Sequence, residues 1–222
     1  MVVFFNAFIL LKIYFVHNNL DLIIYMQGLI FLALSFLASF LVSKFTNLKP
    51  LVNYKDKFEY VPILTSNVFA DLLIIYITFT GILGLKSWQV LSKWYKKYRL
   101  SAMICDILIG VLYLLIARYL AYNIDYEFDI FTFSILAVLV QLVFDFLFYL
   151  IFMALPKGHN HMLDLFKDWA KYAKTDALWG DSILVIVGVI LSSFLNQQSF
   201  DFNMFSLIFS LYLAPYIIHM KD

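Results

Sequence analysis

Residues 130–155 read IFTFSILAVLVQLVFDFLFYLIFMAL, an apolar run in which Asp145 is the only charged residue. A helix needs about 20 predominantly apolar residues to cross the hydrocarbon layer of a membrane. A strand of a transmembrane β-barrel would instead alternate apolar and polar residues over about 10 positions. Because this run is longer and continuously apolar, it predicts a membrane-spanning helix.

Six further apolar segments extend the pattern on both sides of this run. We expect seven spans in all, at residues 2–16, 20–43, 63–85, 100–122, 130–155, 178–195 and 204–220. The first is short and contains Asn6 and Lys12, so we expect either a full span or a half-span there. The sequence predicts an all-α protein, a polytopic bundle of transmembrane helices that forms one integral membrane domain over residues 1–222.

The composition agrees with a membrane protein. Hydrophobic residues make up 64% of the chain and charged residues only 14%, whereas soluble domains carry about 25% charged residues. A net charge of +1 gives no general attraction to nucleic acid, and a single cysteine, Cys105, allows no disulfide within the chain. The expected partner is the lipid bilayer, with a second copy of the chain or other membrane or capsid proteins as further candidates.

Two connections between the spans have the spacing of amphipathic helices. In residues 86–99 and 161–174, apolar and aromatic residues recur every three or four positions, and charged residues fill most other positions. Aromatic rings prefer the headgroup zone, and cations reach for water or anionic lipid. We therefore expect two interfacial helices, which place at the membrane interface the side chains of Trp88, Lys93, Trp94, Lys97, Trp169 and Lys171.

Lysine and arginine are distributed unevenly between the two sides. If all seven segments cross, the first, third and fifth connections and the C-terminus share one side and carry most of these residues. By the positive-inside rule, this places the N-terminus outside and the C-terminus in the cytoplasm. The second connection, with Lys44, Lys49, Lys55 and Lys57, runs against the rule, as it would if one of the first two segments did not span.

Four consecutive predicted spans each contain one aspartate: Asp71, Asp106, Asp145 and Asp181. An acid at the centre of a span costs about 2.5–3.5 kcal/mol on insertion scales, so four of them need an explanation. Each lies on a helix face with small or polar residues, which predicts that all four point into the bundle. With about 1.5 Å per residue, their depths from the cytoplasmic face rise from roughly 5 Å to roughly 21 Å, a staircase across most of the bilayer.

This pattern favours a channel or transporter for protons or small cations. Its path would include the four aspartates together with Asn67, Gln141 and Arg118. Arg118, near the outer end of its span, would either neutralise one of the acids or reach outward to the headgroups.

A structural interpretation of the same residues stays open. Asp106 and Asp181 lie near the starts of their spans, where an acid can cap a helix. Asp145 follows Gln141 by one helical turn and is suited to a hydrogen bond between helices. The protein would then be a structural or assembly protein of a membrane, without transport activity.

The sequence gives little support to an enzyme or a cofactor. His161, Asp164 and Asp168 match no established metal-ligand spacing, so no metal is expected, although they support a third hypothesis, a lipid-handling enzyme at the membrane surface. The chain lacks the His-Glu-x-x-His and Gly-x-Ser-x-Gly motifs of hydrolases. Residues 204–220 contain no lysine, which excludes retinal because its Schiff base needs a lysine in the last span.

A group of short motifs lies between residues 141 and 182. They are Gln141, Asp145-Phe-Leu-Phe, Pro156-Lys-Gly, Asn160, Met162-Leu-Asp-Leu-Phe-Lys and Gly180-Asp-Ser. In these motifs the chain resembles multi-pass membrane proteins of large DNA viruses of algae and protists. The resemblance implies a viral or host-derived membrane, and it assigns no activity or catalytic residue. The structural alternative would then concern such a membrane, for example the internal membrane of a virion.

Overall fold

The computed structural model describes residues 28–81, 88–173 and 176–220, and every regular element in these ranges is a helix. The helix Gly28–Phe45 comes first. It is followed by α2 (Tyr60–Thr80), α3 (Trp88–Tyr98), α4 (Leu100–Asn123), α5 (Ile130–Ala154), α6 (His161–Ala173), α7 (Asp176–Leu195) and α8 (Phe200–Ile218). The predicted all-α class is confirmed, and the two amphipathic segments are the helices α3 and α6.

Among the described residues, five helices are long and apolar enough to cross a membrane: Gly28–Phe45, α2, α4, α5 and α8. Within α7, the segment Trp179–Leu195 is a shorter apolar helix. The predicted span at residues 2–16 and the first part of the span at residues 20–43 lie outside the described residues. The total of seven spans therefore stays a prediction.

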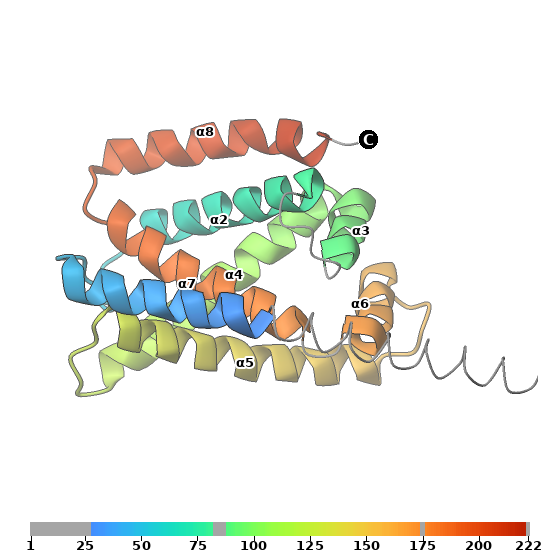
Figure 1. The fold of residues 1–222 in the computed structure, drawn as a ribbon, viewed down its shortest axis with the longest axis horizontal. Helices are drawn as coiled ribbons and strands as arrows, with labels where there is room; N and C mark the ends of the chain where they lie inside the picture. Colours follow the sequence, from blue (N-terminus) through green and yellow to red (C-terminus); the bar gives the residue numbers. More distant parts are fainter. Residues whose placement is uncertain (1–27, 82–87, 174–175, 221–222) are drawn as a thin grey trace, which may run out of the picture.

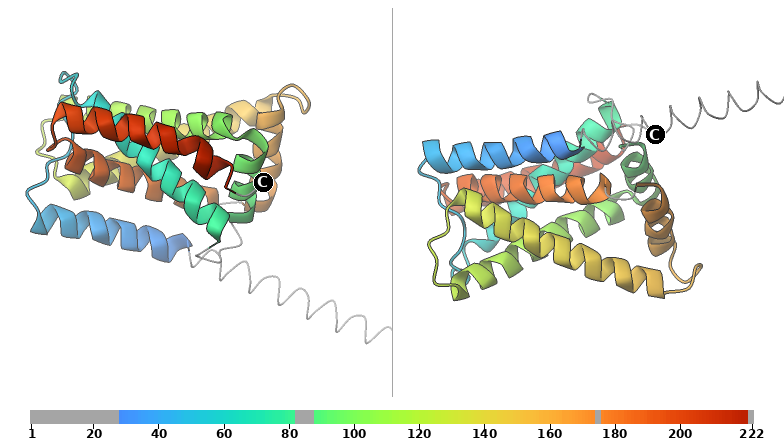
Figure 2. Two further views of the ribbon diagram at one scale, coloured as in Figure 1. Left: turned by 90° about the horizontal axis from the view of Figure 1, so that it is seen from above. Right: turned by 60° about the horizontal axis from the view of Figure 1, so that its bottom comes forward.

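The long helices lie side by side and run back and forth between the two ends of the molecule (Figures 1 and 2). Residues 46–59, 124–129 and 196–199 connect them at one end, which we call the loop end. The helices α3 and α6 lie together at the opposite end, which we call the α3 end. There the Tyr98 hydroxyl donates a hydrogen bond of 2.6 Å to the His161 carbonyl.

Large apolar side chains cover the outside of the long helices. Phe146, Ile151, Phe205 and Ile208 are between 59% and 69% exposed. Monomeric soluble proteins rarely expose contiguous apolar patches larger than a few hundred Å². The surface and the helix lengths are compatible with an integral membrane location.

Local signals set the ends of two helices that carry aspartates. At the start of α5, the Asp129 carboxylate accepts a hydrogen bond of 2.8 Å from the Thr132 N–H and so caps the free backbone donors. At the end of α2, Gly81 adopts a left-handed conformation with φ of 67°. This glycine ends α2 at Thr80, earlier than the predicted residue 85.

Candidate functional site

The four aspartates lie in the half of the bundle nearest the α3 end. Asp71 and Asp145 each lie nine residues before the ends of α2 and α5, whereas Asp106 and Asp181 lie six and five residues after the starts of α4 and α7. At about 1.5 Å per residue, they lie roughly 8–14 Å along their helices from that end. The predicted staircase is therefore wrong in its last step, from Asp145 to Asp71. Because α2 ends early at Gly81, Asp71 is level with Asp145 rather than far deeper.

The helix α3 supplies hydrogen-bond donors to two of the acids. The Tyr95 hydroxyl donates to Oδ1 of Asp71 at 2.7 Å, and the Trp94 indole N–H donates to Oδ2 of Asp106 at 2.9 Å. Asp71 is only 2% exposed, and its Oδ2 has no hydrogen-bond partner among the described residues. The Asp106 side chain thus bonds to an indole. The alternative prediction, that Asp106 caps the start of α4, is wrong.

Tyr95 lies between these two carboxylates. Burial raises the pKa of its hydroxyl well above the ordinary value, and the charges of Asp71 and Asp106 raise it further. The hydroxyl therefore keeps its proton at neutral pH and remains a donor to Asp71.

Asp145 receives two donors. The Tyr113 hydroxyl on α4 donates to its Oδ1, and the Gln141 amide one turn earlier on α5 donates to its Oδ2. The Gln141 carbonyl oxygen in turn accepts a hydrogen bond of 2.7 Å from the Ser182 hydroxyl on α7. This network joins α4, α5 and α7 around Asp145.

The acids influence one another electrostatically in a series that crosses four helices. Asp71 interacts with Asp106, and Asp181 interacts with Asp106 and Asp145. Asp181 is exposed on the surface of the chain, so the prediction that all four aspartates point into the bundle is wrong for this residue. Within the described part of the chain, no ion pair joins a lysine or arginine to any of the four carboxylates. The cluster is acidic and is not neutralised by these residues.

Asn67 occupies the centre of the packed helices, one turn before Asp71 on α2. Its amide nitrogen donates to the Ile63 carbonyl at 2.8 Å. A Cβ placed on Gly110 of α4 would lie 2.3 Å from the Asn67 Oδ1, and one placed on Gly188 of α7 would lie 3.7 Å from it. The two glycines thus give α4 and α7 the room to pack against the Asn67 amide.

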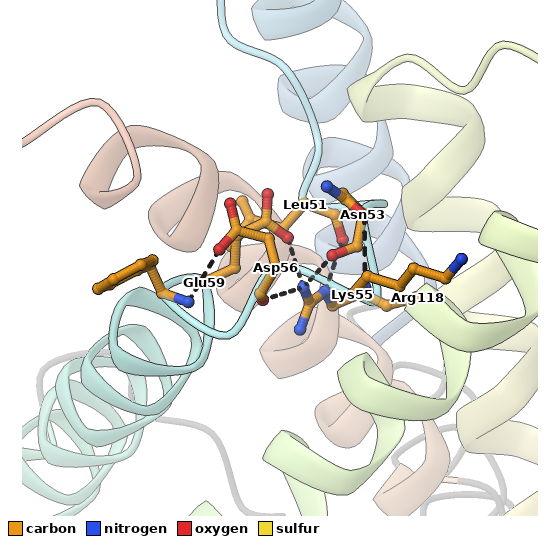
Figure 3. A network of polar contacts seen from close by, with 7 residues as sticks. Leu51, Asn53, Lys55, Asp56, Glu59 and Arg118 are labelled. Carbon is orange, nitrogen blue, oxygen red and sulfur yellow. Dashed lines mark hydrogen bonds and ion pairs between the residues drawn. The ribbon is translucent and has the colours of Figure 1, made fainter.

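Arg118 does not lie with the acids, and this corrects its predicted place on the path. It is 1% exposed and lies at the loop end, where its guanidinium contacts the Glu59 carboxylate at 2.5 Å. It also donates to the backbone carbonyls of Leu51, Asn53 and Asp56 (Figure 3). Burial raises the pKa of Glu59 above its ordinary value, although the charge of Arg118 acts in the opposite direction. Arg118 therefore fixes the connection between Gly28–Phe45 and α2.

The expected interface residues divide into two groups. Lys93 and Lys97 are exposed on α3. Trp94, in contrast, is 1% exposed and is buried against the bundle, because its indole N–H bonds to Asp106 and its ring lies 4.9 Å from that of Phe166. The side chains of Trp88, Trp169 and Lys171 lie outside the described residues.

The residues suggested for a metal site or a surface enzyme do not form one group. Asp164 accepts a hydrogen bond of 2.9 Å from the Gly158 N–H, and Asp168 pairs with Lys157 at 2.7 Å. Among the described residues, no three His, Cys, Asp or Glu side chains are placed to hold a metal ion. These contacts stabilise the connection that leads from α5 into α6.

Sequence reasoning missed the donors on α3. The signal was present: Trp94 and Tyr95 are adjacent polar aromatic residues in a helix that separates the two acid-bearing helices α2 and α4. Buried Tyr and Trp usually find a hydrogen-bond partner. The prediction that α3 lies at the membrane interface accounted for the aromatic rings of these residues. It named no hydrogen-bond partner for the Tyr95 O–H or the Trp94 N–H.

Comparison with known proteins adds no family to this description. No family model, no curated protein and no solved structure matches the chain.

Proposed function

We propose that this multi-pass membrane protein moves protons or small cations through the aspartate cluster. The observation that carries the proposal is the series of four carboxylates, one on each of four neighbouring helices, that interact electrostatically without an ion pair to a described lysine or arginine. Ionisable residues inside membrane bundles commonly mark ion pathways and proton relays.

The chemistry of the cluster supports this role. Several negative charges close together in a low-dielectric bundle repel one another, so protons or cations are needed among them. The groups that contact Asp71, Asp106 and Asp145 are neutral hydroxyl, indole and amide donors. These donors stabilise a carboxylate without neutralising it permanently, and a tyrosine hydroxyl can also accept a hydrogen bond from a protonated acid.

We further propose that the α3 end faces the cytoplasm. Lys93, Lys96, Lys97, Lys157 and Lys167 belong to the connections at this end, in agreement with the positive-inside rule. In a variant without Cys105, a cysteine at position 96 should resist an impermeant thiol reagent applied to intact cells. A cysteine at position 57, at the loop end, should react. The opposite labelling pattern would reverse the orientation.

Ion flux tests the proposed function. The purified full-length protein is reconstituted into liposomes, and a potassium diffusion potential is imposed while an internal dye reports pH. Inward proton movement above that of protein-free liposomes is the expected result. If neither protons nor sodium ions move in liposomes that contain the folded protein, the transport proposal is wrong.

A structural role is the second candidate, and one observation favours it. The bonds from Trp94 to Asp106 and from Tyr113 to Asp145 each join two helices directly. Such contacts are worth about 0.6–1.7 kcal/mol in membrane proteins and would hold the bundle together without transport. An assembly protein of a membrane, such as the internal membrane of a virion, would need only such contacts. A protein with this structural role would fold stably in liposomes and would move neither protons nor sodium ions.

A further inference from the structure

The helix α3 has two faces of opposite character. Trp94 and Tyr95 are each 1% exposed and face the bundle. Lys93, Lys96 and Lys97 are exposed and are spaced by three and four residues, so they share the other face. The helix contains no acidic residue, and in the described part of the chain no carboxylate forms an ion pair with these three lysines. We call them the lysine face.

Chain geometry holds the lysine face near the membrane surface. Only Arg99 separates α3 from α4, and its guanidinium donates to the Ile218 carbonyl at the end of α8 at 3.1 Å. The 24 residues of α4 extend about 36 Å at 1.5 Å per residue, which is longer than the hydrocarbon layer of about 30 Å. The first residues of α4 therefore reach the headgroup layer, and α3, which precedes α4 in the chain, ends at that depth.

We propose that the lysine face binds anionic lipid headgroups of the membrane that the protein spans. The charges are complementary, and long lysine side chains can reach several ångströms along the surface to a phosphate. A lysine near an anionic membrane surface strengthens the association by about five-fold. This inference rests on the membrane placement in the proposed function but does not depend on transport.

The position of the lysine face ties lipid binding to the aspartate cluster. Lys93 and Lys96 flank Trp94 and Tyr95, the residues that donate to Asp106 and Asp71. Lipid bound on one side of α3 therefore stabilises the helix whose other side supplies the donors to these two acids. Anionic lipid is in this way a regulator of the contact between α3 and the cluster.

Lipid selectivity tests the proposal. The full-length protein is reconstituted into phosphatidylcholine vesicles with spin-labelled phosphatidylglycerol or spin-labelled phosphatidylcholine as the probe. We expect the anionic probe to be enriched about five-fold at the protein, and the enrichment to fall in high salt, which screens exposed charges. It should be lost in K93Q/K96Q/K97Q and kept in K93R/K96R/K97R.

A matched control removes three exposed lysines from the loop end instead, in K44Q/K49Q/K57Q. This variant should keep most of the enrichment. Equal enrichment in the α3 variant and the wild-type protein, or equal loss in both glutamine variants, would overturn the proposal. Because the readout is lipid contact, a protein without ion flux can still pass this test. A protein that does not insert shows no immobilised probe of either kind.

Discussion

Tyr95 and Asp71 form a buried hydrogen bond of 2.7 Å between a helix at the end of the bundle and a helix inside it. Both residues are almost fully buried, at 1% and 2% exposed, and the second oxygen of Asp71 has no partner among the described residues. The hydroxyl of Tyr95 is therefore the contact that makes the burial of this acid tolerable. A shift of α3 would therefore change the hydrogen bonding of the aspartate cluster.

Removing this hydroxyl should destabilise the protein. Tyr95→Phe leaves both Asp71 oxygens without a side-chain donor, and an unsatisfied buried polar group costs about 1–3 kcal/mol. Thermal unfolding in detergent should show this loss. Tyr119→Phe is the control, because Tyr119 is 51% exposed and should change stability little. In the Asp71→Leu background, which offers no acceptor, the effect of Tyr95→Phe should shrink, whereas equal effects in both backgrounds would show that the two residues are not coupled.

The packing of α4 against Asn67 gives a second prediction. Gly110→Ala places a Cβ 2.3 Å from the Asn67 Oδ1, so the helices must shift, at a cost of about 1–3 kcal/mol for overpacking. Gly180→Ala is the matched control, because a Cβ there meets nothing within 4 Å. The Asn67→Ala change should relieve most of the loss in Gly110→Ala. If Gly110→Ala is as stable as Gly180→Ala, the close packing around Asn67 is wrong.

The two described ion pairs should differ greatly in their importance. Arg118→Leu leaves Glu59 buried without its partner, and breaking a buried pair in this way costs about 3–5 kcal/mol. Lys157→Leu breaks a pair whose side chains are 56% and 49% exposed, and such pairs are worth about 0–1 kcal/mol. Arg118→Leu should also speed proteolysis in residues 46–59, which its guanidinium holds. Similar unfolding temperatures for both variants would contradict this account.

Glu59 should give the protein a pH-dependent stability. Because its pKa in the folded protein is raised above the ordinary value of 4.5, the folded state binds its proton more tightly than the unfolded chain does. The contribution of Glu59 is then full below pH 4.5 and is lost as the pH rises through the raised value. Relative to the wild type, Glu59→Gln should gain stability as the pH rises from 4.5 through the raised pKa of Glu59. A relative loss over this range would show that Arg118 dominates.

Apolar runs made the helical class predictable. The run around Asp145 and the amphipathic spacing of residues 161–174 correspond to α5 and α6 almost residue for residue, because burial in lipid or against a bundle imposes these patterns. The end of α2 was not predictable in the same way. The apolar residues continue beyond Thr80, and the left-handed conformation of Gly81 ends the helix there.

The acids of the site were predictable, but their partners were not. An aspartate in an apolar run is conspicuous in any sequence, whereas Tyr95 and Tyr113 are ordinary residues of aromatic-rich helices. Their roles depend on contacts between helices, which hydropathy does not encode. Arg118 shows the same limit, because its partner Glu59 lies 59 positions away and at the loop end of the bundle.

Proton flux in the Asp145→Asn variant tests the central claim most directly. Asparagine keeps the shape of the side chain and can still accept from the Tyr113 hydroxyl, but it cannot ionise. The change should cost at most about 0.6–1.7 kcal/mol of stability, and Asp201→Asn, at an exposed aspartate in the first turn of α8, is the matched control. We predict that flux is abolished in folded Asp145→Asn and unchanged in Asp201→Asn. Wild-type flux in a well-folded Asp145→Asn protein would contradict the account.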